Sequence, residues 1–538
     1  MNITELLAAY ERDGVHLWAD DGRLRFRAPQ GYLTEARRAE LSTHKAAILE
    51  HLAADEDRRV LRHDADNRHE PFPLTDIQAA YLIGRADAYA YGGVACHAYV
   101  ELGLAELDPE RVSAAWRTLI ARHDMLRVIV HPDGYQQVLP DVPDLTIEVT
   151  ETRDDTAVED VRARLSRRTG PTDRWPLFTL HITRAPEHDV LHLSFDMLAV
   201  DHAGLRLLIA EFQTLYAGGE LPPLGITFRD YVLARRALAE TPEYARDRAY
   251  WTERLEELPP APELPTAEGW AAPAVPAAPA VPAEGNATFR RLERTLPADA
   301  AGALAERARR HGLTSATVLL TAYAETIGRW SRAPRFTLNV PTVDRLPLHE
   351  DIDRVVGDFT SLELLAVDLS EEMSFAERAR VIGARLLEDL EHSLFTGSEL
   401  LAELSHRAGS PVLMPVVFTS ALGPARSSEG ALREVEHALT QTPQVWIDCQ
   451  VMERGDAVVL SFDVREGVLP DGMAEDVFGA WTDLVERLAG AEEAWERPAD
   501  VPLPAAQAER RDRVNATAGP LPDALLHEPV LARARTTP

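Results

Sequence analysis

The chain has 538 residues, of which 45% are hydrophobic and 27% are charged, and its net charge at pH 7 is −31. This length provides for several domains or a few large ones, and the composition is that of a globular protein. The excess of acidic groups argues against a nucleic-acid partner, because the phosphates would be repelled.

The N-terminus and the cysteines narrow the class of protein further. The opening segment MNITELLAAYERDG is amphipathic and acidic, whereas a signal peptide has a basic start and an apolar core. The sequence has no run of about 18 apolar residues, so we expect neither a transmembrane helix nor a membrane partner. Two cysteines, Cys96 and Cys449, are too few for a disulfide framework or a multi-cysteine zinc site. We therefore expect a cytoplasmic protein that binds no metal.

Residues 1–55 are predicted to form a small unit with the order helix, hairpin, helices. Apolar residues recur at helical spacing from Ile3 to Tyr10. The stretch VHLWADDGRLRF then places two short strands around an Asp-Gly pair, which is a strong hairpin signal. A second helical pattern, TEARRAELSTHKAAILEHL, begins at Thr34, a candidate N-cap.

Composition divides the remaining chain. Residues 56–70 are charged and aperiodic and are predicted to be a linker. A large segment, 71–258, leads into a connector at 259–285 that is rich in proline and alanine and therefore semi-rigid. A second large segment covers 286–495, and 496–538 is expected to hold a linker and the start of a further domain. Two segments of similar size joined in this way suggest a cleft between them, a common place for a site.

Both large segments mix strands and helices, which predicts an α/β (α+β) fold. Short apolar runs rich in β-branched or aromatic residues predict strands, and two of them, QVWIDCQVM and AVVLSFDV, flank the turn ERGD as a hairpin. The stretches HAGLRLLIAEFQTLYAG and ATVLLTAYAETIGRWS carry apolar residues at helical spacing and predict amphipathic helices.

Two aspartates, Asp196 and Asp201, follow the apolar run VLHLSF. Asp201 is a candidate N-cap for the next helix, because a carboxylate accepts backbone N–H groups and favours the positive end of the helix dipole. Asp196, at the end of a strand, is costly to bury unless an arginine or hydrogen bonds compensate its charge. A metal site with His202 is an alternative, although no ordered set of further ligands accompanies it.

This stretch resembles the condensation domains of nonribosomal peptide synthetases. Those domains read His-His-x-x-x-Asp-Gly at this place, and their second histidine is tied to amide-bond formation. Asp196 and Met197 occupy the two histidine positions here, and a thioether cannot transfer protons. The stretch is more similar to the heterocyclization branch of the family, Asp-x-x-x-x-Asp-x-x-Ser, except that Gly204 replaces the serine.

Further segments resemble the remaining motifs of that family in the same order along the chain. They are FPLTDIQAAYLIGR, RHDMLRVIVHPDGYQQ, LPPAPELP, FTLNVPTVDRLPLHEDIDRVVGDFTSLELL, PVVFTSALG and QTPQVWIDCQ. The resemblance implies two chloramphenicol-acetyltransferase-like lobes that form a V-shaped pseudo-dimer, with tunnels that meet between them.

Residues 1–55 resemble the αββαα docking domains of the tubulysin type, which capture the C-terminal tail of an upstream synthetase subunit. Arg23, Arg25 and Arg27 alternate along the second predicted strand and therefore share one face. An acidic tail that added there as a strand would pair with them, and a solvated basic face is the alternative. The C-terminal LHEPVLARARTTP looks like the opening of an adenylation domain, which we expect downstream in the full-length protein.

The resemblance implies a reaction in two parts on carrier-bound substrates. The amine of a Cys, Ser or Thr on the downstream carrier attacks the upstream acyl thioester and forms an amide. The side-chain thiol or hydroxyl then attacks the amide carbonyl and water leaves, which gives a thiazoline or an oxazoline. The substrates are expected to arrive on the phosphopantetheine arms of donor and acceptor carrier domains, with no cofactor bound by this chain itself.

Cyclodehydration needs proton transfer, and Asp448 is the first candidate for it. Strand alternation in QVWIDCQ places Asp448 on one face with Trp446 and Gln450, and the neighbouring tryptophan is expected to raise the pKa of the carboxyl. Thr419, in VVFTS, would position Asp448 or bind the substrate oxygen. The matching Thr and Asp of the family are linked to cyclodehydration, whereas a strand threonine and a salt-bridged aspartate are the alternative.

Other roles follow from the resemblance alone. Asn339 matches a family asparagine whose amide would hydrogen-bond the new carbonyl, and Gln450 is a second candidate of this kind. The aspartate that matches Asp201 pairs with an arginine of the other lobe, for which Arg345 is the candidate. We therefore expect Asp196 and Asp201 to maintain the architecture of the cleft.

Three other functions stay open. A condensation domain that stops at the amide would lack its histidine, because Met197 stands there. A non-catalytic module that docks carrier domains is compatible with Gly204 and with Asp344, which replaces a family asparagine. A metal hydrolase is the third alternative.

Overall fold

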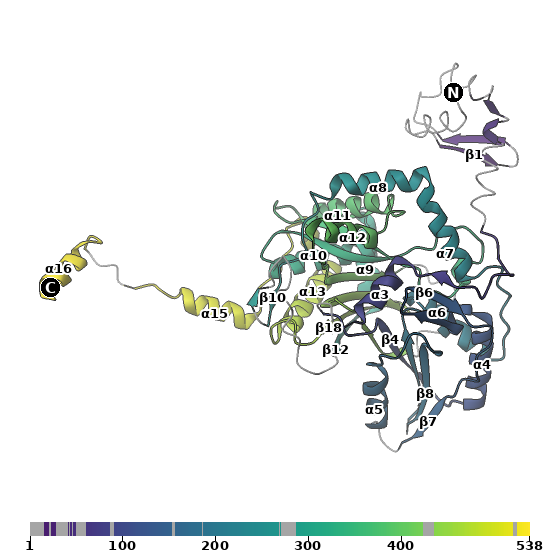
Figure 1. Ribbon diagram of the computed structural model, residues 1–538. Coiled ribbons are helices and arrows are strands. Elements are labelled where there is room, and N and C mark those ends of the chain that lie inside the picture. The colour runs from purple at the N-terminus through teal and green to yellow at the C-terminus, as the bar shows by residue number, and fades with distance from the viewer. Residues whose placement is uncertain are drawn as a thin grey trace.

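The computed structural model describes residues 61–86, 91–152, 156–185, 187–267, 287–422, 435–519 and 524–537, with shorter pieces at 16–20, 23–27, 41, 44–45, 47–49 and 269–270. Two mixed units of sheet and helix lie side by side and make up the main body (Figure 1). This architecture agrees with the predicted α/β fold.

The C-terminal unit is built on a six-stranded sheet with the order β12-β18-β17-β15-β13-β14. Its strands are β12 (Phe289–Leu296), β13 (Arg335–Val343), β14 (Thr360–Asp368), β15 (Val416–Ala421), β17 (Ile447–Arg454) and β18 (Ala457–Arg465). Its helices are α9 (Ala298–Arg310), α10 (Ser315–Trp330), α11 (Phe375–Leu390), α12 (Gly397–Ala408), α13 (Met473–Gly490) and α14 (Glu493–Glu496).

Strand β15 pairs in parallel with both β13 and β17, whereas the other pairs of this sheet are antiparallel. Strands β17 and β18 form the predicted hairpin, which is thereby confirmed. Gly455 in its turn has a φ of +62°, a left-handed conformation that glycine adopts without steric cost.

The N-terminal unit is built on a five-stranded sheet with the order β16-β4-β9-β8-β7. Its strands are β4 (His97–Leu104), β7 (Glu148–Glu151), β8 (Phe178–Arg184), β9 (Asp189–Asp196) and β16 (Val435–Gln441). Its helices are α3 (Asp76–Gly84), α4 (Pro109–Arg122), α5 (Thr156–Leu165), α6 (His202–Tyr216) and α7 (Phe228–Ala237). Helix α8 (Pro242–Arg254) packs instead against the C-terminal unit, where Trp251 shares an apolar cluster with Leu364 and Phe395. A small sheet adds β3 (Phe72–Pro73), β5 (Val128–His131) and β6 (Tyr135–Val138).

One strand crosses between the units. Strand β16 comes from the C-terminal half of the sequence but pairs antiparallel with β4, from Val435 opposite Leu102 to Gln441 opposite His97. The chain therefore leaves the C-terminal sheet after β15, adds an edge strand to the N-terminal sheet, and returns as β17. The sequence analysis did not predict this crossing, which ties the two units together.

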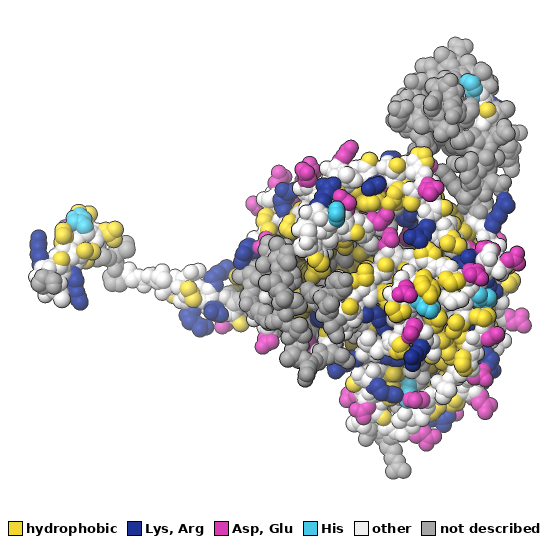
Figure 2. Space-filling view, viewed as in Figure 1, with side chains coloured by type: hydrophobic (Ala, Val, Ile, Leu, Met, Phe, Trp, Pro, Cys, Tyr) yellow, Lys and Arg dark blue, Asp and Glu magenta, His cyan; other side chains and the backbone are white. Residues whose placement is uncertain are grey.

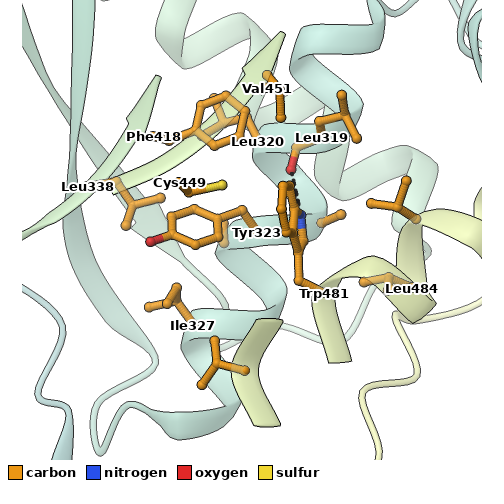
Figure 3. Packing of buried hydrophobic residues seen from close by; sticks show 14 of the residues in the cluster. Leu319, Leu320, Tyr323, Ile327, Leu338, Phe418, Cys449, Val451, Trp481 and Leu484 are labelled. Atoms are coloured by element: carbon orange, nitrogen blue, oxygen red, sulfur yellow. Dashed lines mark hydrogen bonds between the residues drawn. The ribbon is translucent and has the colours of Figure 1, made fainter. Parts of the chain in front are cut away.

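The core of the C-terminal unit lies between the sheet and helices α10 and α13 (Figure 3). Phe418 of β15 and Cys449 and Val451 of β17 point into it and pack with Tyr323 and Trp481. Side chains alternate along a strand, so the residues that flank these three on β15 and β17 face the opposite side of the sheet.

Both helices predicted from apolar spacing are confirmed. Helix α6 begins at His202, directly after Asp201, and α10 begins at Ser315 after the N-cap Thr314. Helix α6 buries one apolar face, whereas α10 is buried on nearly all sides from Val318 to Ala324, as expected of a helix inside the core.

The predicted N-terminal hairpin is confirmed as well. Strands β1 (His16–Asp20) and β2 (Arg23–Arg27) pair antiparallel, and β2 carries the three arginine positions in alternation. Residues 41, 44–45 and 47–49 are helical, whereas the rest of the predicted docking helices lie outside the described residues. Most of the predicted linker 56–70 is described, but most of the proline-rich connector 259–285 is not.

The surface of the described residues carries charges of both signs. Figure 2 shows acidic and basic side chains interspersed over the visible face. Helices α15 (Ala505–Asn515) and α16 (Glu528–Thr536) extend away from the body (Figure 1). Among all the residues that the structure describes, no helix is long and apolar enough to cross a membrane.

Candidate active site between the two units

A cavity of about 1630 Å³ lies between the two units. Helices α3 and α6 and strand β4 form one wall, while β13, β15 and β17 form the other. Five of the predicted site residues line it, namely Asp201, Asn339, Thr419, Asp448 and Gln450. The cleft that the sequence suggested is therefore present.

One row of paired residues crosses five strands at the C-terminal wall. Asn339 lies opposite Val417, and Val417 lies opposite Asp448. Asp448 in turn lies opposite Asp463, and Asp463 opposite Arg291. Directly opposed residues share one face of a sheet, so this row gathers polar side chains from distant parts of the chain.

Asp448 accepts hydrogen bonds on both of its carboxyl oxygens. Thr419 Oγ1 donates to Oδ1 at 2.9 Å, and Gln450 Nε2 donates to Oδ2 at 2.7 Å. These two contacts fix the plane of the carboxyl group at the cavity wall. The hydroxyl of Thr419 is thus directed at Asp448.

Burial raises the pKa of Asp448 to about 6, and the negative charge of Asp463 adds to the rise. The raised pKa expected from the sequence is thus confirmed, but the expected position of Trp446 on the same strand face as Asp448 is wrong. Strand β17 begins at Ile447, and Trp446 belongs to the hydrophobic core, where its ring meets that of Tyr91 edge-on at 5.4 Å. Because its pKa lies near neutral pH, the carboxyl is able both to take up and to release a proton.

Gln450 is held by the groups behind the cavity wall. Its Oε1 accepts a hydrogen bond from Arg291 Nη2 at 2.8 Å, and its Nε2 also donates to Thr440 Oγ1 at 2.7 Å. Arg291 forms a two-pronged ion pair with Asp463, at 2.7 and 2.6 Å. The side-chain amide of Gln450 is thus largely occupied by hydrogen bonds with Arg291, Thr440 and Asp448.

Three of these groups, Arg291, Thr440 and Asp463, were not singled out from the sequence. They lie far apart along the chain and meet through strand pairing and through the crossing strand β16. The one local signal is a charged residue, Asp463, within the apolar strand LSFDV.

Asn339 lies in the same row and is 7% exposed. Its Oδ1 is buried and has no hydrogen-bond partner among the described residues. An unpaired acceptor at the cavity wall complements an N–H group of a substrate, while the amide nitrogen is the donor that would suit a carbonyl.

His202 faces this cavity too. Burial lowers the pKa of His202 to about 4, helped by the charges of Arg206 and Arg291, so its ring is neutral at pH 7. Its Nε2 has no partner within the described part of the chain. No group of three or more metal-ligating side chains is arranged to hold an ion in the described ranges.

Asp196 lies at the end of β9 and is paired within the N-terminal unit. Arg85 Nη1 lies 2.6 Å from Asp196 Oδ2, and the backbone N–H of Leu198 donates to Oδ1 at 3.2 Å. Arg85 also donates to the carbonyl of Gly170 at 2.6 Å. The arginine and the hydrogen bond expected from the sequence are present and offset part of the cost of burying Asp196, although burial still raises the pKa of this carboxyl.

Asp201 combines the two roles that the sequence left as alternatives. As the N-cap of α6 it accepts the N–H of Gly204 at 2.5 Å, and it also accepts the N–H of Phe359 at 3.1 Å. Arg345 Nη2 lies 3.5 Å from Asp201 Oδ1, so the expected ion pair joins the N-terminus of α6 to the other half of the chain. Arg345 also donates to two backbone carbonyls, those of Ile352 and Val355.

The two departures from the family pattern have local explanations. A Cβ atom at Gly204 would lie 2.9 Å from Val200 Cγ2 and 3.0 Å from Asp201 Oδ1, so a serine would require its neighbours to shift. Asp344 is paired with Arg235 of α7 at 2.7 Å. Both residues therefore fit their surroundings in this chain.

Residues 71–448 match the condensation-domain family. The chain belongs to the condensation-domain family. Residues 3–53 match the TubC N-terminal docking domain. The order of docking domain and condensation domain is the one that the sequence predicted, and this prediction is confirmed.

Two curated relatives illustrate the similarity. Pyochelin synthetase PchF of Pseudomonas aeruginosa is 41% identical over 508 residues, which cover 92% of this chain and 27% of that protein. Phenyloxazoline synthase MbtB of Mycobacterium tuberculosis is 38% identical over 486 residues, 87% of this chain and 33% of that protein. The chain thus spans between a quarter and a third of the length of these relatives.

Solved structures agree with the heterocyclization branch of the family. The cyclization-docking bidomain of the EpoB synthetase from Sorangium cellulosum is 34% identical with a TM-score of 0.73, and the match covers 92% of this chain and all of that one. The synthetase FmoA3 is 34% identical with a TM-score of 0.76, over 89% of this chain and 49% of that one. The predicted heterocyclization-type domain is confirmed by the match to the EpoB cyclization-docking bidomain.

Proposed function

We propose that this protein joins a carrier-bound acyl group to a carrier-bound Cys, Ser or Thr and then closes the amide to a thiazoline or oxazoline. The observation that carries the proposal is the Thr419–Asp448 pair at the wall of the cavity between the units. Met197 stands where a condensation domain that stops at the amide would carry its histidine. A phenyloxazoline synthase and a cyclization-docking bidomain among the relatives support the proposal.

Ring closure begins with attack of the substrate thiol or hydroxyl on the amide carbonyl carbon. The ionised Asp448 takes the proton of the attacking group while a new C–S or C–O bond forms, and it passes that proton to the carbonyl oxygen, which becomes a hydroxyl. A pKa of about 6 leaves most of this carboxyl ionised at pH 7 and able to accept the proton.

Dehydration completes the ring. Asp448, ionised again, takes the hydrogen of the ring nitrogen and gives it to the departing hydroxyl, so that the C–O bond breaks and water leaves. The ring nitrogen loses its hydrogen and forms the C=N double bond, so the balance of the second step is the loss of one water. Thr419 keeps the carboxyl aimed at the reacting atoms, and Asn339 Oδ1 accepts the substrate N–H.

The substrates and partners belong to the same proposal. Acyl and aminoacyl groups enter the cavity on phosphopantetheine arms of donor and acceptor carrier domains. The N-terminal domain binds the C-terminal tail of an upstream subunit, with β2 as the edge that receives it. An adenylation domain downstream in the full-length protein selects Cys, Ser or Thr.

The test supplies the protein with an acyl-loaded upstream carrier and Cys- or Ser-loaded downstream carriers, and measures the intact mass of the downstream carrier. Acyl transfer with the loss of one further water supports condensation with cyclodehydration. Transfer without that loss would establish a domain that stops at the amide. No transfer, with binding of both carriers retained, would establish a docking module.

Asp448→Asn separates the two steps. This variant keeps the size of the side chain but cannot accept the proton, so the open amide should accumulate while its rate of formation stays near that of the unaltered protein. The expected loss in ring formation is about 10²–10⁴-fold. Normal ring formation by this variant would refute the proton-transfer role of Asp448.

A further inference from the structure

A buried ion pair that takes no part in the proposed chemistry lies in the same row of the sheet as Asp448. The side chains of Arg291 on β12 and Asp463 on β18 are 5% and 1% exposed. Burying an ion pair is expensive, and the pair often adds less stability than a well-packed apolar pair would. Its position beside the proposed catalytic carboxyl suggests a role other than stability.

Two hydrogen-bonded routes connect this ion pair to Asp448. The first runs from Arg291 Nη2 to Gln450 Oε1, and from Gln450 Nε2 to Asp448 Oδ2. The second runs through Thr440, whose hydroxyl and backbone N–H donate to Asp463 Oδ2 at 2.6 and 2.8 Å. Thr440 Oγ1 also accepts the second hydrogen bond of Gln450 Nε2, so the amide is held from both sides.

We propose that Arg291 and Asp463 are positioning residues for ring closure, which fix the orientation of Gln450 and set the electrostatic surroundings of Asp448. This inference rests on the proposed role of Asp448. The ion pair places the carboxyl of Asp463 directly opposite Asp448 on the neighbouring strand and Arg291 one strand further. A fixed negative charge there disfavours a second negative charge on Asp448, whereas Arg291 favours it.

Three other titratable groups that interact with Asp448 are uncharged at neutral pH. Tyr81 of α3 and Tyr323 of α10 are buried phenols near Asp448, and burial holds the pKa of each well above its usual range. Burial likewise raises the pKa of the thiol of Cys449, the next residue on β17. Burial is the largest cause of the raised pKa of Asp448, and of the charged groups Asp463 raises it further whereas Arg291 lowers it.

Two single variants should shift the pKa of Asp448 in opposite directions. Asp463→Asn removes the opposing negative charge, so the limb of the pH–rate profile of ring formation that reports Asp448 should move to lower pH by about one unit. Arg291→Gln leaves Asp463 without its cation, so the same limb should move to higher pH by about one unit. A merely structural role would lower the rate in both variants without opposite shifts, and that result would overturn the inference.

Matched controls come from neighbouring pairs at the surface. Arg290→Gln alters the next residue of β12, which pairs with Glu475 at 2.8 Å, and Asp483→Asn alters an exposed partner of Arg294. Both should leave the pH profile unchanged. A shift in either of them as large as that of Asp463→Asn would show that the effect is not specific to the buried pair and would overturn the inference.

A double variant covers the case in which the single variants fail to fold. Arg291→Gln with Asp463→Asn leaves no unpaired charge, and the limb should move to lower pH because the repulsion from Asp463 outweighs the attraction of Arg291. An unmoved limb in the folded double variant would overturn the inference. Asp448→Asn tests the proposed function separately. If this variant loses ring formation while the pH–rate profiles of the Arg291 and Asp463 variants stay unshifted, the positioning role alone is refuted.

Discussion

Asp448 and Asp463 lie directly opposite one another on the antiparallel strands β17 and β18, yet their surroundings differ. Asp463 is paired with Arg291, whereas Asp448 accepts hydrogen bonds from the neutral groups of Thr419 and Gln450. Two like charges so placed repel, and the charge of Asp463 contributes to the raised pKa of Asp448. The arrangement leaves Asp448 with a proton affinity suited to exchange near neutral pH.

The pH dependence of ring formation should follow Asp448. Its pKa is about 6 in the folded protein, so the carboxylate needed to accept a proton disappears as the pH falls below 6. We expect the rate of ring formation to decrease about tenfold per pH unit below that value, while amide formation lacks this limb. Single-turnover assays that follow both products between pH 5 and 8 measure it, and the limb should vanish in the residual activity of Asp448→Asn.

The threonine hydroxyl should matter more than the shape of the side chain. Thr419→Val keeps the volume but removes the donor to Asp448 Oδ1, which leaves a buried carboxyl oxygen without that partner. We expect ring formation to fall by about 10–100-fold, since such a loss costs about 1–3 kcal/mol. Thr419→Ser retains a hydroxyl and should keep most of the activity. Equal losses in the two variants would show that packing, and not the hydrogen bond, is what Thr419 contributes.

The ion pair between Asp201 and Arg345 should contribute to the stability of the junction. Arg345→Met leaves the buried carboxylate of Asp201 without its cation and should lower the free energy of unfolding by about 3–5 kcal/mol, as measured by denaturant unfolding. Arg335→Met, which breaks an exposed pair with Asp368, is the matched control and should cost about 0–1 kcal/mol. Equal costs would mean that Arg345 does not hold the junction.

Glu363 on β14 should lower the stability of the protein at alkaline pH. Both of its carboxyl oxygens are buried without hydrogen-bond partners among the described residues, and burial raises its pKa to about 9. A raised pKa means that the protonated form is favoured in the folded state. Its contribution to stability is therefore complete below the ordinary pKa of 4.5 and is lost progressively as the pH rises through about 9.

The variant Glu363→Gln tests this directly, because its amide stays neutral at every pH. We expect it to stabilise the fold by about 1–3 kcal/mol at pH 8 and to change little at pH 4.5. Thermal unfolding at the two pH values measures the difference. A variant destabilised at pH 8 but not at pH 4.5 would show that Glu363 makes a favourable contact in its ionised form, and would contradict the prediction.

The docking strand should recognise an acidic peptide. Reversing the charge of Arg23, Arg25 and Arg27 to glutamate should abolish binding of the upstream C-terminal tail, because strand alternation places the three on one face. Binding by the unaltered protein should weaken with salt, since exposed charges are screened. Calorimetry with a synthetic tail peptide measures both effects.

A matched control for the docking experiment reverses three exposed arginines of the condensation domain. Arg309, Arg310 and Arg407 lie on the helices α9 and α12, where each pairs with a glutamate of its own helix. Their reversal changes the net charge by the same amount and should leave tail binding intact. Loss of binding in this control would attribute the effect to net charge instead of the strand.

Local patterns predicted local structure well. The hairpin around ERGD, the helix after Asp201 and the helix at Ser315 depend on turn residues, caps and apolar spacing within a few residues. The same reasoning misplaced Trp446, because alternation was extended one residue beyond the start of β17 at Ile447. The end of a strand depends on its pairing partners, which the local sequence does not specify.

The sequence by itself determined the family, the order of the domains, and the identity of Thr419, Asp448 and Asn339 as candidates, because these depend on residue types at fixed spacing. Only the tertiary structure decided how Arg291 and Asp463 meet Asp448, and that β16 crosses to the N-terminal sheet. Register between distant strands is set by packing of the whole sheet, and a pKa is set by burial and by charges that the register brings together. A short stretch of sequence therefore specifies neither the strand register nor the pKa.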